Sequence, residues 1–579
     1  ETGSWKNNVC FVADDGSNAD GYMIQHAQQA DDLGEYINTS HPEFMVNKIY
    51  FDSYKKDFSG GLSTYPDVKT NLQKQLKNGL LLINYTGHGN TVSWSDEKVL
   101  TESDITKSTY TRLPVWITAT CDFCRFDAPV TSAGEQVFLN KVSGGIGLFT
   151  TTRVAYSSPN FSINDNLIRN LFEKKNGRRL TLGEVMKATK QALGSSRYKL
   201  GFALIGDPAL KLAYPEYRMR VTAINGNPVT DEPVDFKALQ KITVEGEVLD
   251  PGGNIATGFN GLLNPTVMDS RLSYETLDNN KTGTKFKYTD YSNILFIGND
   301  SVRAGKFSFT FTVPKDISYS NEFGKMNLYA SDETNNLEAQ GAYLNYRVGG
   351  TDDNAEDDYD GPEIRALYLN DSTFVSGDQV NTTPFFVARL WDKSGVNITG
   401  SSIGHDMMLI IDGDPSFSFN LNSYYELIPG SDGEGIAKYL IPALTPGIHT
   451  AEFKVWDIQN NSTTYEFEFE VVEGLKPYLL ELTASPSPAR EQVEFHLFHN
   501  RPESQLTVGI MVYDMMGRLQ WKHQETGASE LFKSYTVTWD LTNNRGGRLR
   551  PGVYIYRAAI SSGGSKEATD AKKLIILAQ

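Results

Sequence analysis

Two residues of this sequence combine a reactive side chain with an unusual position. His88 lies between two glycines at the end of LLLINYTGHG (80–89), and Cys121 ends PVWITATC (114–121), 33 residues after His88. In both stretches an apolar run, typical of a buried strand, leads directly to the polar side chain. In open α/β sheets the active site forms beyond the carboxyl ends of the strands. If these two strands are neighbours, their ends lie about 5 Å apart, and His88 and Cys121 face each other across a cleft.

A cysteine that faces a histidine suits nucleophilic catalysis. The reactive form of cysteine is the thiolate, which a nearby imidazolium favours. The glycines on both sides of His88 would let the main chain approach a substrate closely. The N–H groups of Gly89 and Cys121 could point at a carbonyl oxygen and form an oxyanion hole.

Other interpretations of these residues stay open at this point. A histidine at a strand end is commonly a polar loop residue, and a buried cysteine is commonly a small apolar filler of the core. The stretch CDFC (121–124) is formally a CxxC motif, so Cys121 and Cys124 could form a redox pair. Zinc binding is disfavoured, because the sequence has no second CxxC motif and its histidine spacing does not fit a zinc finger.

The elements that must position His88 and Cys121 alternate between strands and helices over about the first 214 residues. Continuous apolar runs are typical of parallel strands buried on both faces, and Pro66 and Gly79 bracket one helix as start and stop signals. The alternation predicts an α/β sandwich. The expected strands are 9–14, 48–52, 80–86, 114–121, 144–152 and 202–206, and the expected helices are 22–38, 66–78, 134–142, 160–175 and 180–193.

The rest of the chain has a different character. Short strands alternate with turns rich in Gly, Pro, Asn and Asp, a pattern that predicts β-sandwiches. The expected domains are the α/β domain over 1–214, a β-sandwich over 215–350, an acidic linker over 351–361, an Ig-like β-sandwich over 362–474 and a last β-sandwich over 475–579.

Composition excludes some classes of function. The chain has 54 Lys and Arg against 71 Asp and Glu, a net charge of −17, which is unfavourable for nucleic-acid binding. It contains no run of 18 apolar residues that could form a membrane-spanning helix, and no signal peptide is visible. Three cysteines do not settle the redox compartment. Residues 1–3, ETG, are expected to be an addition, so that the natural sequence starts upstream.

Several motifs together resemble the gingipain family of cysteine peptidases. INYTGHG (83–89) is similar to the histidine motif of that family, and Cys121 follows at the family's spacing, at the end of the next strand. IQH (24–26) and IGDPALKL (205–212) are similar to further landmarks of the family, so the resemblance covers about residues 5–214. It implies a caspase-like α/β sandwich with a Cys–His dyad. Cys121 would be the nucleophile, His88 the general acid/base, and the amides of Gly89 and Cys121 would line the oxyanion hole.

Two positions depart from the family pattern. Gingipains place a glutamate near the histidine in a short stretch after the first strand, and the residue that matches it is Asp15, which would orient His88. Asp14 and Asp15 could equally be solvated loop acids or calcium ligands, so the expectation is that no cofactor is required, although structural calcium could bind. Arginine-specific gingipains carry an acid directly before IQH, where this chain has Met23, either in a specificity pocket or in the core. A thioether cannot pair with a guanidinium, so cleavage after arginine is not expected.

The last unit resembles the C-terminal sorting domain of the type IX (Por) secretion system, on the stretches SPSPAREQVEFHLF, YDMMGRL and TWDLTNNRGGRLRPGVYIYR. Together with a gingipain-like domain, this implies the surface sortase of that system, a cysteine endopeptidase and transpeptidase. Such an enzyme would remove the sorting domain from secreted cargo proteins and attach the cargo to anionic lipopolysaccharide. It would lie peripherally on the outer membrane of a Gram-negative bacterium, with an outer-membrane barrel as its docking partner.

Two alternatives to the sortase are kept. The chain could be a secreted gingipain-like hydrolase that is itself type IX cargo, or a non-catalytic adhesin or scaffold with a relic site. The resemblance also implies a further α/β subdomain ahead of the residues matched here.

Overall fold

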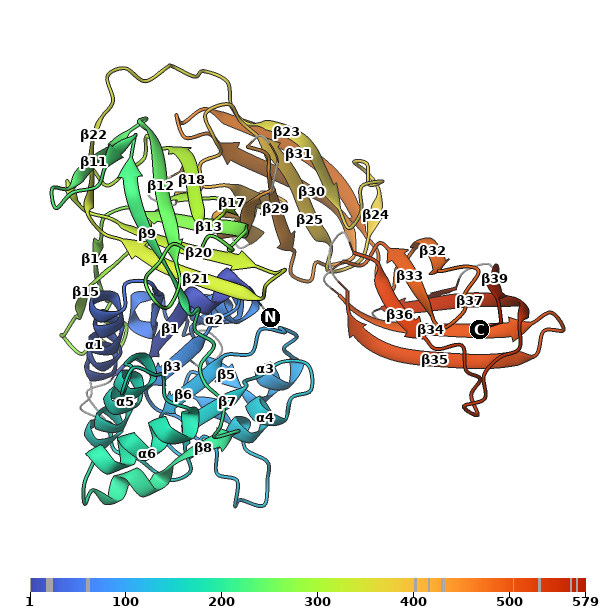
Figure 1. Cartoon of the computed structure of the whole chain (residues 1–579), viewed down its shortest axis with the longest axis horizontal. Helices are drawn as coiled ribbons and strands as arrows, with labels where there is room; N and C mark the ends of the chain where they lie inside the picture. Colours follow the sequence, from blue (N-terminus) through green and yellow to red (C-terminus); the bar gives the residue numbers. More distant parts are fainter. Residues whose placement is uncertain are drawn as a thin grey trace. The chain divides into compact units, whose positions relative to one another are not determined.

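The computed structural model describes most of the chain (Figure 1). Contacts divide it into two compact units, Glu1–Val313 with Ile317–Ala355, and Pro314–Asp316 with Glu356–Gln579, and each unit is described by itself. No described helix has the length and apolar character needed to cross a membrane. The described residues are 2–16, 24–58, 63–399, 404–414, 417–428, 431, 433–502, 504–529, 533–562, 565–568 and 571–578.

The first unit is built on a six-stranded sheet. Its order is β2-β1-β3-β6-β7-β8; the first five strands are parallel, and only β8 runs antiparallel to its neighbour. Every residue of β3, β6 and β7 is buried, as expected for parallel strands covered on both faces. The strands are β1 (Asn8–Ala13), β2 (Met45–Tyr50), β3 (Leu82–Thr86), β6 (Val115–Ala119), β7 (Gly147–Thr151) and β8 (Phe202–Gly206).

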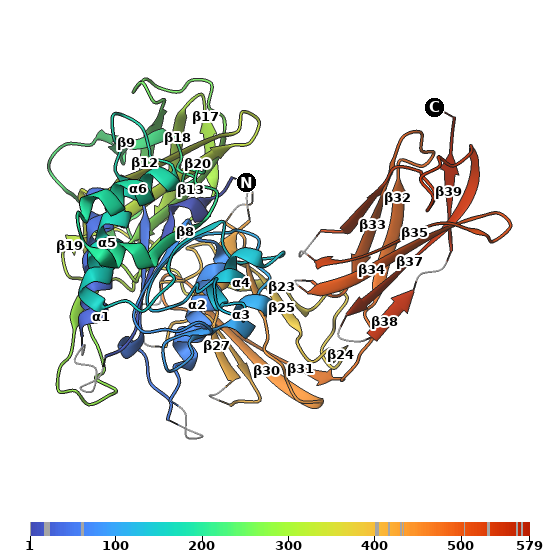
Figure 2. The same ribbon diagram turned by 90° about the horizontal axis from the view of Figure 1, so that it is seen from below.

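Helices cover both faces of this sheet, which makes a three-layer α/β sandwich (Figures 1 and 2). The apolar faces of α1, α5 and α6 share one core with the sheet, and those of α2, α3 and α4 share a second core on the other face. The expected sandwich architecture is therefore confirmed. The helices are α1 (Gln25–Ser40), α2 (Pro66–Asn78), α3 (Glu102–Lys107), α4 (Ala133–Leu139), α5 (Ser157–Phe172) and α6 (Leu182–Ala192), and a short hairpin of β4 (Ser93–Trp94) and β5 (Leu100–Thr101) precedes α3.

A β-sandwich completes the first unit. Its main sheet has the order β10-β9-β12-β18-β17-β13-β20-β21, and alternate residues of β12 and β18 point into an apolar core. Its strands are β9 (Tyr217–Ile224), β10 (Asn227–Pro228), β11 (Val234–Ala238), β12 (Lys241–Leu249), β13 (Gly261–Met268), β14 (Leu272–Glu275), β15 (Lys287–Asp290), β16 (Ile294–Ile297), β17 (Asp300–Arg303), β18 (Lys306–Thr312), β19 (Glu322–Phe323), β20 (Lys325–Asp332), β21 (Leu337–Tyr343) and β22 (Tyr346–Thr351).

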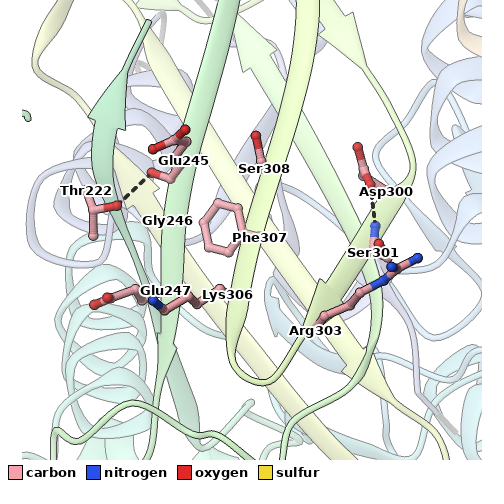
Figure 3. A pocket seen from close by; sticks show the side chains of 10 residues that line it. All are labelled: Thr222, Glu245, Gly246, Glu247, Asp300, Ser301, Arg303, Lys306, Phe307 and Ser308. Carbon is pink, nitrogen blue, oxygen red and sulfur yellow. Dashed lines mark hydrogen bonds between the residues drawn. The ribbon is translucent and has the colours of Figure 1, made fainter. Parts of the chain in front are cut away.

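A hollow lies on the outer face of this sheet (Figure 3). It measures about 490 Å³ and lies over β9, β12, β17 and β18. Gly246 and Phe307 are cross-strand partners there, and a side chain at Gly246 would meet the Phe307 ring at 2.1 Å. Phe307 is buried in the apolar core, so its ring covers the glycine on the core side of the sheet and not in the hollow. The hollow is remote in sequence from His88 and Cys121, and none of its lining residues comes from the α/β domain.

Polar contacts fix the sandwich against the α/β domain. Lys325, at the start of β20, is 1% exposed and donates to the main-chain oxygen of Phe44 at 2.6 Å and to Asn38 Oδ1 at 3.2 Å. Next to it, Asn327 donates to Glu43 O at 2.6 Å and accepts from Asn7 at 2.9 Å. Buried hydrogen bonds of this kind favour one packing geometry.

The buried position of Lys325 predicts a pH dependence of stability. Burial, followed by the repulsion of Arg271, lowers the pKa of Lys325 from 10.5 to about 7. Between these pH values the unfolded chain binds a proton that the folded chain does not, so the free energy of unfolding rises with pH, by up to about 1.4 kcal/mol per pH unit. Below pH 7 both states carry the proton and this rise disappears. Urea unfolding of the wild type and of Lys325→Met across pH 7–10 should show this rise in the wild type alone, whereas the exposed control Lys306→Met should keep it. Equal slopes in wild type and Lys325→Met would contradict the buried, neutral amine.

The second unit contains two further β-sandwiches, each with an apolar core of its own. The fold class expected from the sequence, a caspase-like α/β sandwich followed by β-sandwiches, is confirmed. The first of the two has β23 (Glu363–Leu369), β24 (Gln379–Val380), β25 (Phe385–Trp391), β26 (Met408–Ile411), β27 (Ser418–Asn420), β28 (Tyr425–Leu427), β29 (Gly435–Leu440), β30 (Gly447–Trp456) and β31 (Ser462–Val471). The second has β32 (Leu479–Ser485), β33 (Val493–His499), β34 (Gln505–Asp514), β35 (Leu519–Ala528), β36 (Tyr535–Trp539), β37 (Gly552–Ser562), β38 (Ser565–Ala568) and β39 (Lys572–Ile576).

Candidate functional site

Neighbouring parallel strands bring His88 and Cys121 to the same edge of the sheet. Strand β3 pairs with β6 in a register that sets Thr86 opposite Ala119, and the Gly87 N–H extends the ladder to Ala119 O at 3.3 Å. His88 and Cys121 each follow that last pair by two residues. Both side chains are half-buried, so they are held by the fold and still reach the surface. The two residues whose pairing was predicted are thus delivered by adjacent strand ends.

The sulfur of Cys121 lies against the loop that follows β7. Its Sγ is 3.2 Å from Ala155 O, and the Ala155 N–H donates to Sγ at 3.4 Å. The sulfur is thus held between the N–H and the carbonyl group of one residue. Helix α5 begins two residues later, and Asn160 of its first turn donates to Thr120 O at 3.4 Å. The N-terminal end of α5 therefore lies next to the residue that precedes Cys121.

The main chain of His88 is fixed from two sides. Asp14 Oδ2 accepts the His88 N–H at 2.9 Å. The His88 carbonyl accepts from the Tyr85 hydroxyl at 2.6 Å and from the Ser95 N–H at 3.0 Å. The ring of His26, at the start of α1, meets the His88 ring edge to face with 5.2 Å between centroids. The imidazole is thus carried on a rigid support, which catalytic groups require.

The two glycines around His88 are required by close packing. A Cβ at Gly87 would lie 2.3 Å from Asp14 Cβ, and a Cβ at Gly89 would lie 2.5 Å from Thr120 Oγ1. Any side chain at either position would displace the acid or the strand end beside the histidine. Close approach was expected here towards a substrate; in the structure the space is used by the protein itself.

The geometry is compatible with an oxyanion hole at Gly89 and Cys121. Gly89 forms an antiparallel bridge with Trp94. The two hydrogen bonds of this bridge are made by the flanking residues, from Asn90 N–H to Ser93 O and from Ser95 N–H to His88 O. The bridge therefore does not consume the Gly89 N–H. Its role with the Cys121 amide as donor to a carbonyl oxygen stays a prediction.

The acid that accepts the main-chain N–H of His88 is Asp14. Asp15 is buried, and its Oδ2 accepts from Lys56 Nζ at 2.8 Å, Tyr65 OH at 2.8 Å and Asn280 Nδ2 at 2.6 Å. None of the described hydrogen bonds joins Asp15 to His88, so its role as orienter stays a prediction. The sequence analysis did not give Asp14 a role in supporting His88. The only signal was that Asp14 is the first residue after β1.

Electrostatics make the two neighbouring acids different. Burial and then the negative charges of Asp15 and Glu97 raise the pKa of Asp14, against the opposing effect of the His88 N–H. Burial acts to lower the pKa of Lys56, but its hydrogen bonds to Asp15 and Glu97 outweigh this effect and the pKa is raised. Lys56 is thus a fixed cation behind the histidine.

Two clusters of three acidic residues could in principle hold the expected calcium ion, and they differ in whether a cation of the protein is already bound. Oxygens of Asp14, Asp15 and Glu97 lie within 4.8 Å of one another, but Lys56 Nζ already binds Asp15 at 2.8 Å and Glu97 at 2.7 Å. The ammonium group occupies the place that a metal ion would take, so these residues do not fit calcium. In the second unit, oxygens of three aspartates also lie within 4.8 Å of one another, and calcium binding there stays a prediction; they are Asp358, Asp392 and Asp457.

Two further residues from the sequence analysis have different outcomes. Met23 lies outside the described residues, so its place in a specificity pocket or in the core stays a prediction. Cys124 is buried and free, and its N–H donates to Thr151 O at 3.0 Å. Burial raises the pKa of Cys124 to about 11, so its thiolate is disfavoured at neutral pH. This environment does not suit the redox-pair interpretation.

The lip beside Cys121 is apolar. The loop whose main chain contacts the sulfur carries Val154 and Tyr156, which are 67% and 60% exposed, and Leu200 nearby is 74% exposed. Thr152 N–H donates to Gly201 O at 2.7 Å, which joins the two segments side by side. Exposed apolar side chains that cluster beside a reactive group are typical of a binding surface.

Comparisons with known proteins give one family match and several similar structures. Residues 1–213 match the sequence model of peptidase family C25, and no protein with a curated description matches the chain. The dimeric latent PorU of Porphyromonas gingivalis shares 26% identity over 99% of this chain and 65% of the PorU chain, with a TM-score of 0.32. The Arg-specific cysteine proteinase gingipain R shares 18% over 59% of this chain and 67% of its own, with a TM-score of 0.31.

These findings confirm the resemblance of residues 1–213 to the gingipain family of cysteine peptidases. The tandem Ig repeats of Dlar are a further similar structure, with 10% identity over 38% of this chain and 99% of that chain and a TM-score of 0.16. The chain spans 65% of the length of the PorU chain that it matches.

Proposed function

We propose, from the match of residues 1–213 to peptidase family C25, that the chain is a cysteine endopeptidase and transpeptidase of the bacterial cell surface. The observation that carries the proposal is the delivery of His88 and Cys121 by the adjacent ends of β3 and β6. A thiol and an imidazole at the carboxyl edge of a parallel sheet form the dyad that thioester chemistry requires.

The reaction would proceed in two halves. The Cys121 thiolate adds to the scissile carbonyl carbon, and the amides of Gly89 and Cys121 bind the oxygen as it becomes negative. The C–N bond then breaks, and the His88 imidazolium gives its proton to the leaving amine, which leaves a thioester on Cys121. In the second half an incoming amine adds to the thioester, neutral His88 takes the proton of that amine, and the thiolate leaves. Water in place of the amine gives hydrolysis.

The substrates proposed are secreted cargo proteins that carry a C-terminal sorting domain, and the proposed acceptor is an amine of anionic lipopolysaccharide. The resemblance of residues 477–579 to such sorting domains supports this assignment. We propose further that the C-terminal β-sandwich stays attached and docks the enzyme on an outer-membrane barrel, so that it lies peripherally on the cell surface. In a hydrolase that is itself cargo, this β-sandwich would instead be cut off.

A labelled amine distinguishes transfer from hydrolysis. Cargo with its sorting domain is incubated with the enzyme and a biotinylated primary amine at a concentration well above that of the enzyme. The expected product is a cargo chain that ends in an amide to biotin at the cleavage site, read by intact mass, and Cys121→Ala should give none. Cleavage that yields only a free carboxylate would support the hydrolase, and no cleavage by the wild-type enzyme would contradict both.

A further inference from the structure

We propose that the loop between β14 and β15 (residues 276–286, the β14–β15 loop) completes the active site of the α/β domain, with Asn280 as a positioning residue. Asn280 would hold the acid pair that supports His88. The inference rests on the proposed function of the His88–Cys121 dyad and adds a part that comes from the β-sandwich.

The β14–β15 loop is anchored on residues 52–56 of the α/β domain. The carboxylate of Asp52 accepts the N–H groups of Asp278 and Asn279 at 2.9 and 2.8 Å, and also the Asn279 side-chain amide at 2.9 Å. Asn279 also donates to Tyr54 O at 2.9 Å and accepts the Lys56 N–H at 3.1 Å. One carboxylate that binds three loop donors fixes the loop in a single position.

This anchor places the Asn280 side chain between the carboxylate of Asp15 and the ammonium group of Lys56. Its Nδ2 donates to Asp15 Oδ2 at 2.6 Å and to Gly16 O at 2.9 Å, and its Oδ1 accepts from Lys56 Nζ at 2.9 Å. A side-chain amide can satisfy an acceptor and a donor at once because its two ends differ. Aspartate in its place would set a further negative charge beside Asp15, and leucine would leave both partners with one contact fewer.

The contact reaches His88 through two consecutive residues. Asp15 is joined to Asp14 by one peptide bond, and Asp14 is tied to β3 through its N–H to Thr86 O at 3.1 Å and to the His88 N–H through Oδ2 at 2.9 Å. A shift of the Asp15 carboxylate therefore displaces the acid that holds the histidine. Since buried polar networks have few alternative arrangements, the loss of one partner is transmitted to the others.

Docking of the sandwich does not depend on Asn280. Lys325 and Asn327 bind Phe44 O and Glu43 O, and the Arg271–Glu35 ion pair at 2.6 Å adds a further contact. A change at Asn280 should therefore leave the two domains attached and alter the chemistry of the dyad. A purely structural contact would show the opposite pattern.

The groups that can titrate around this network come from several elements. Those that face Asp15 are Asp14, Lys56, Tyr65 and Glu97, and those next to the His88 ring and main chain are His26 and Tyr85. Because these groups interact electrostatically with the dyad, a change in the network should shift the pH dependence of the activity of the dyad.

The test uses the whole chain and two variants, Asn280→Leu and Asn280→Asp, with Asn254→Leu in the same sandwich as matched control. Two readouts are measured between pH 5 and 9: the rate of Cys121 alkylation by iodoacetamide, and kcat and KM for a cargo peptide. Asn280→Leu is expected to lower kcat and the alkylation rate at pH 7 about tenfold or more, with little change in KM or melting temperature. Asn280→Asp should move the pH profile upward, because the added negative charge favours the imidazolium form of His88. The control should match the wild type.

The outcomes separate the two levels of inference. If iodoacetamide alkylates Cys121 of the wild type no faster than an ordinary thiol, and no peptide is cleaved, the proposed function fails. If the wild type is reactive and both Asn280 variants share its pH profile and kcat, only the role of the β14–β15 loop is overturned. If Asn280→Leu does not fold, the nearly isosteric Asn280→Asp decides alone, and an unchanged profile in that variant overturns the role.

Discussion

A Cys121→Ala variant is expected to lose cleavage and transfer together, by roughly 10⁴-fold or more, because removal of a nucleophile leaves only binding and oxyanion stabilisation. No other described cysteine can replace it. Cys10 lies buried within β1 and Cys124 is buried beside α4, and burial raises the pKa of both thiols. The measurement is kcat/KM for a cargo substrate, with circular dichroism to show that the variant is folded.

Cys124→Ala is the matched control for this result. It removes a buried thiol three residues away and should cost on the order of 1 kcal/mol of stability with nearly unchanged activity. Comparable losses in the two variants would contradict a single nucleophile and restore the interpretation of Cys121 and Cys124 as a redox pair. Full activity in Cys121→Ala would remove the thioester mechanism altogether.

The sequence predicted the parts of the site that follow from local pattern. Uninterrupted apolar runs gave β3 and β6 as buried strands, and the glycines around His88 marked a place where the chain passes close to other atoms. Pro66 and Gly79 gave the two ends of α2 correctly. Helix α3 was missed, although Thr101 and Asp104 form a capping box that could have revealed it. Its six residues are too few to show a clear helical period.

The support behind His88 could not be read from local pattern. Asn280 and Asp15 are 265 positions apart in the chain, and neither residue stands out by type or spacing. Adjacent acids such as Asp14 and Asp15 also look alike in a sequence, whereas the fold turns one towards the His88 N–H and the other towards Lys56. The change of pattern near residue 215 predicted separate domains over 1–214 and 215–350. In the structure the two pack into one unit, and this packing brings the β14–β15 loop to the site.

The His88→Ala variant is expected to lower kcat by roughly 10²–10⁴-fold, the usual contribution of general acid–base catalysis. Two effects add here. The thioester cannot form efficiently when the leaving amine receives no proton, and the Cys121 thiolate loses its imidazolium partner. Alkylation of Cys121 by iodoacetamide at pH 7 should therefore also slow, and a higher pH should be needed to restore it. Melting temperature should change little, because the main chain of His88 is held by Asp14, Tyr85 and Ser95 through atoms that alanine retains.

Added imidazole gives this prediction its sharpest form. His88 is half-buried, so its replacement by alanine leaves a space that a small free base can enter from solvent. Millimolar imidazole should therefore recover part of kcat in His88→Ala and none in Cys121→Ala. His523→Ala, a histidine of the C-terminal β-sandwich that is paired with Glu525 at 2.8 Å, should behave like the wild type. A His88→Ala enzyme with unchanged kcat and alkylation rate would show that the dyad is not formed by these strand ends. His26, whose ring contacts that of His88, would then be the next candidate for the proton carrier.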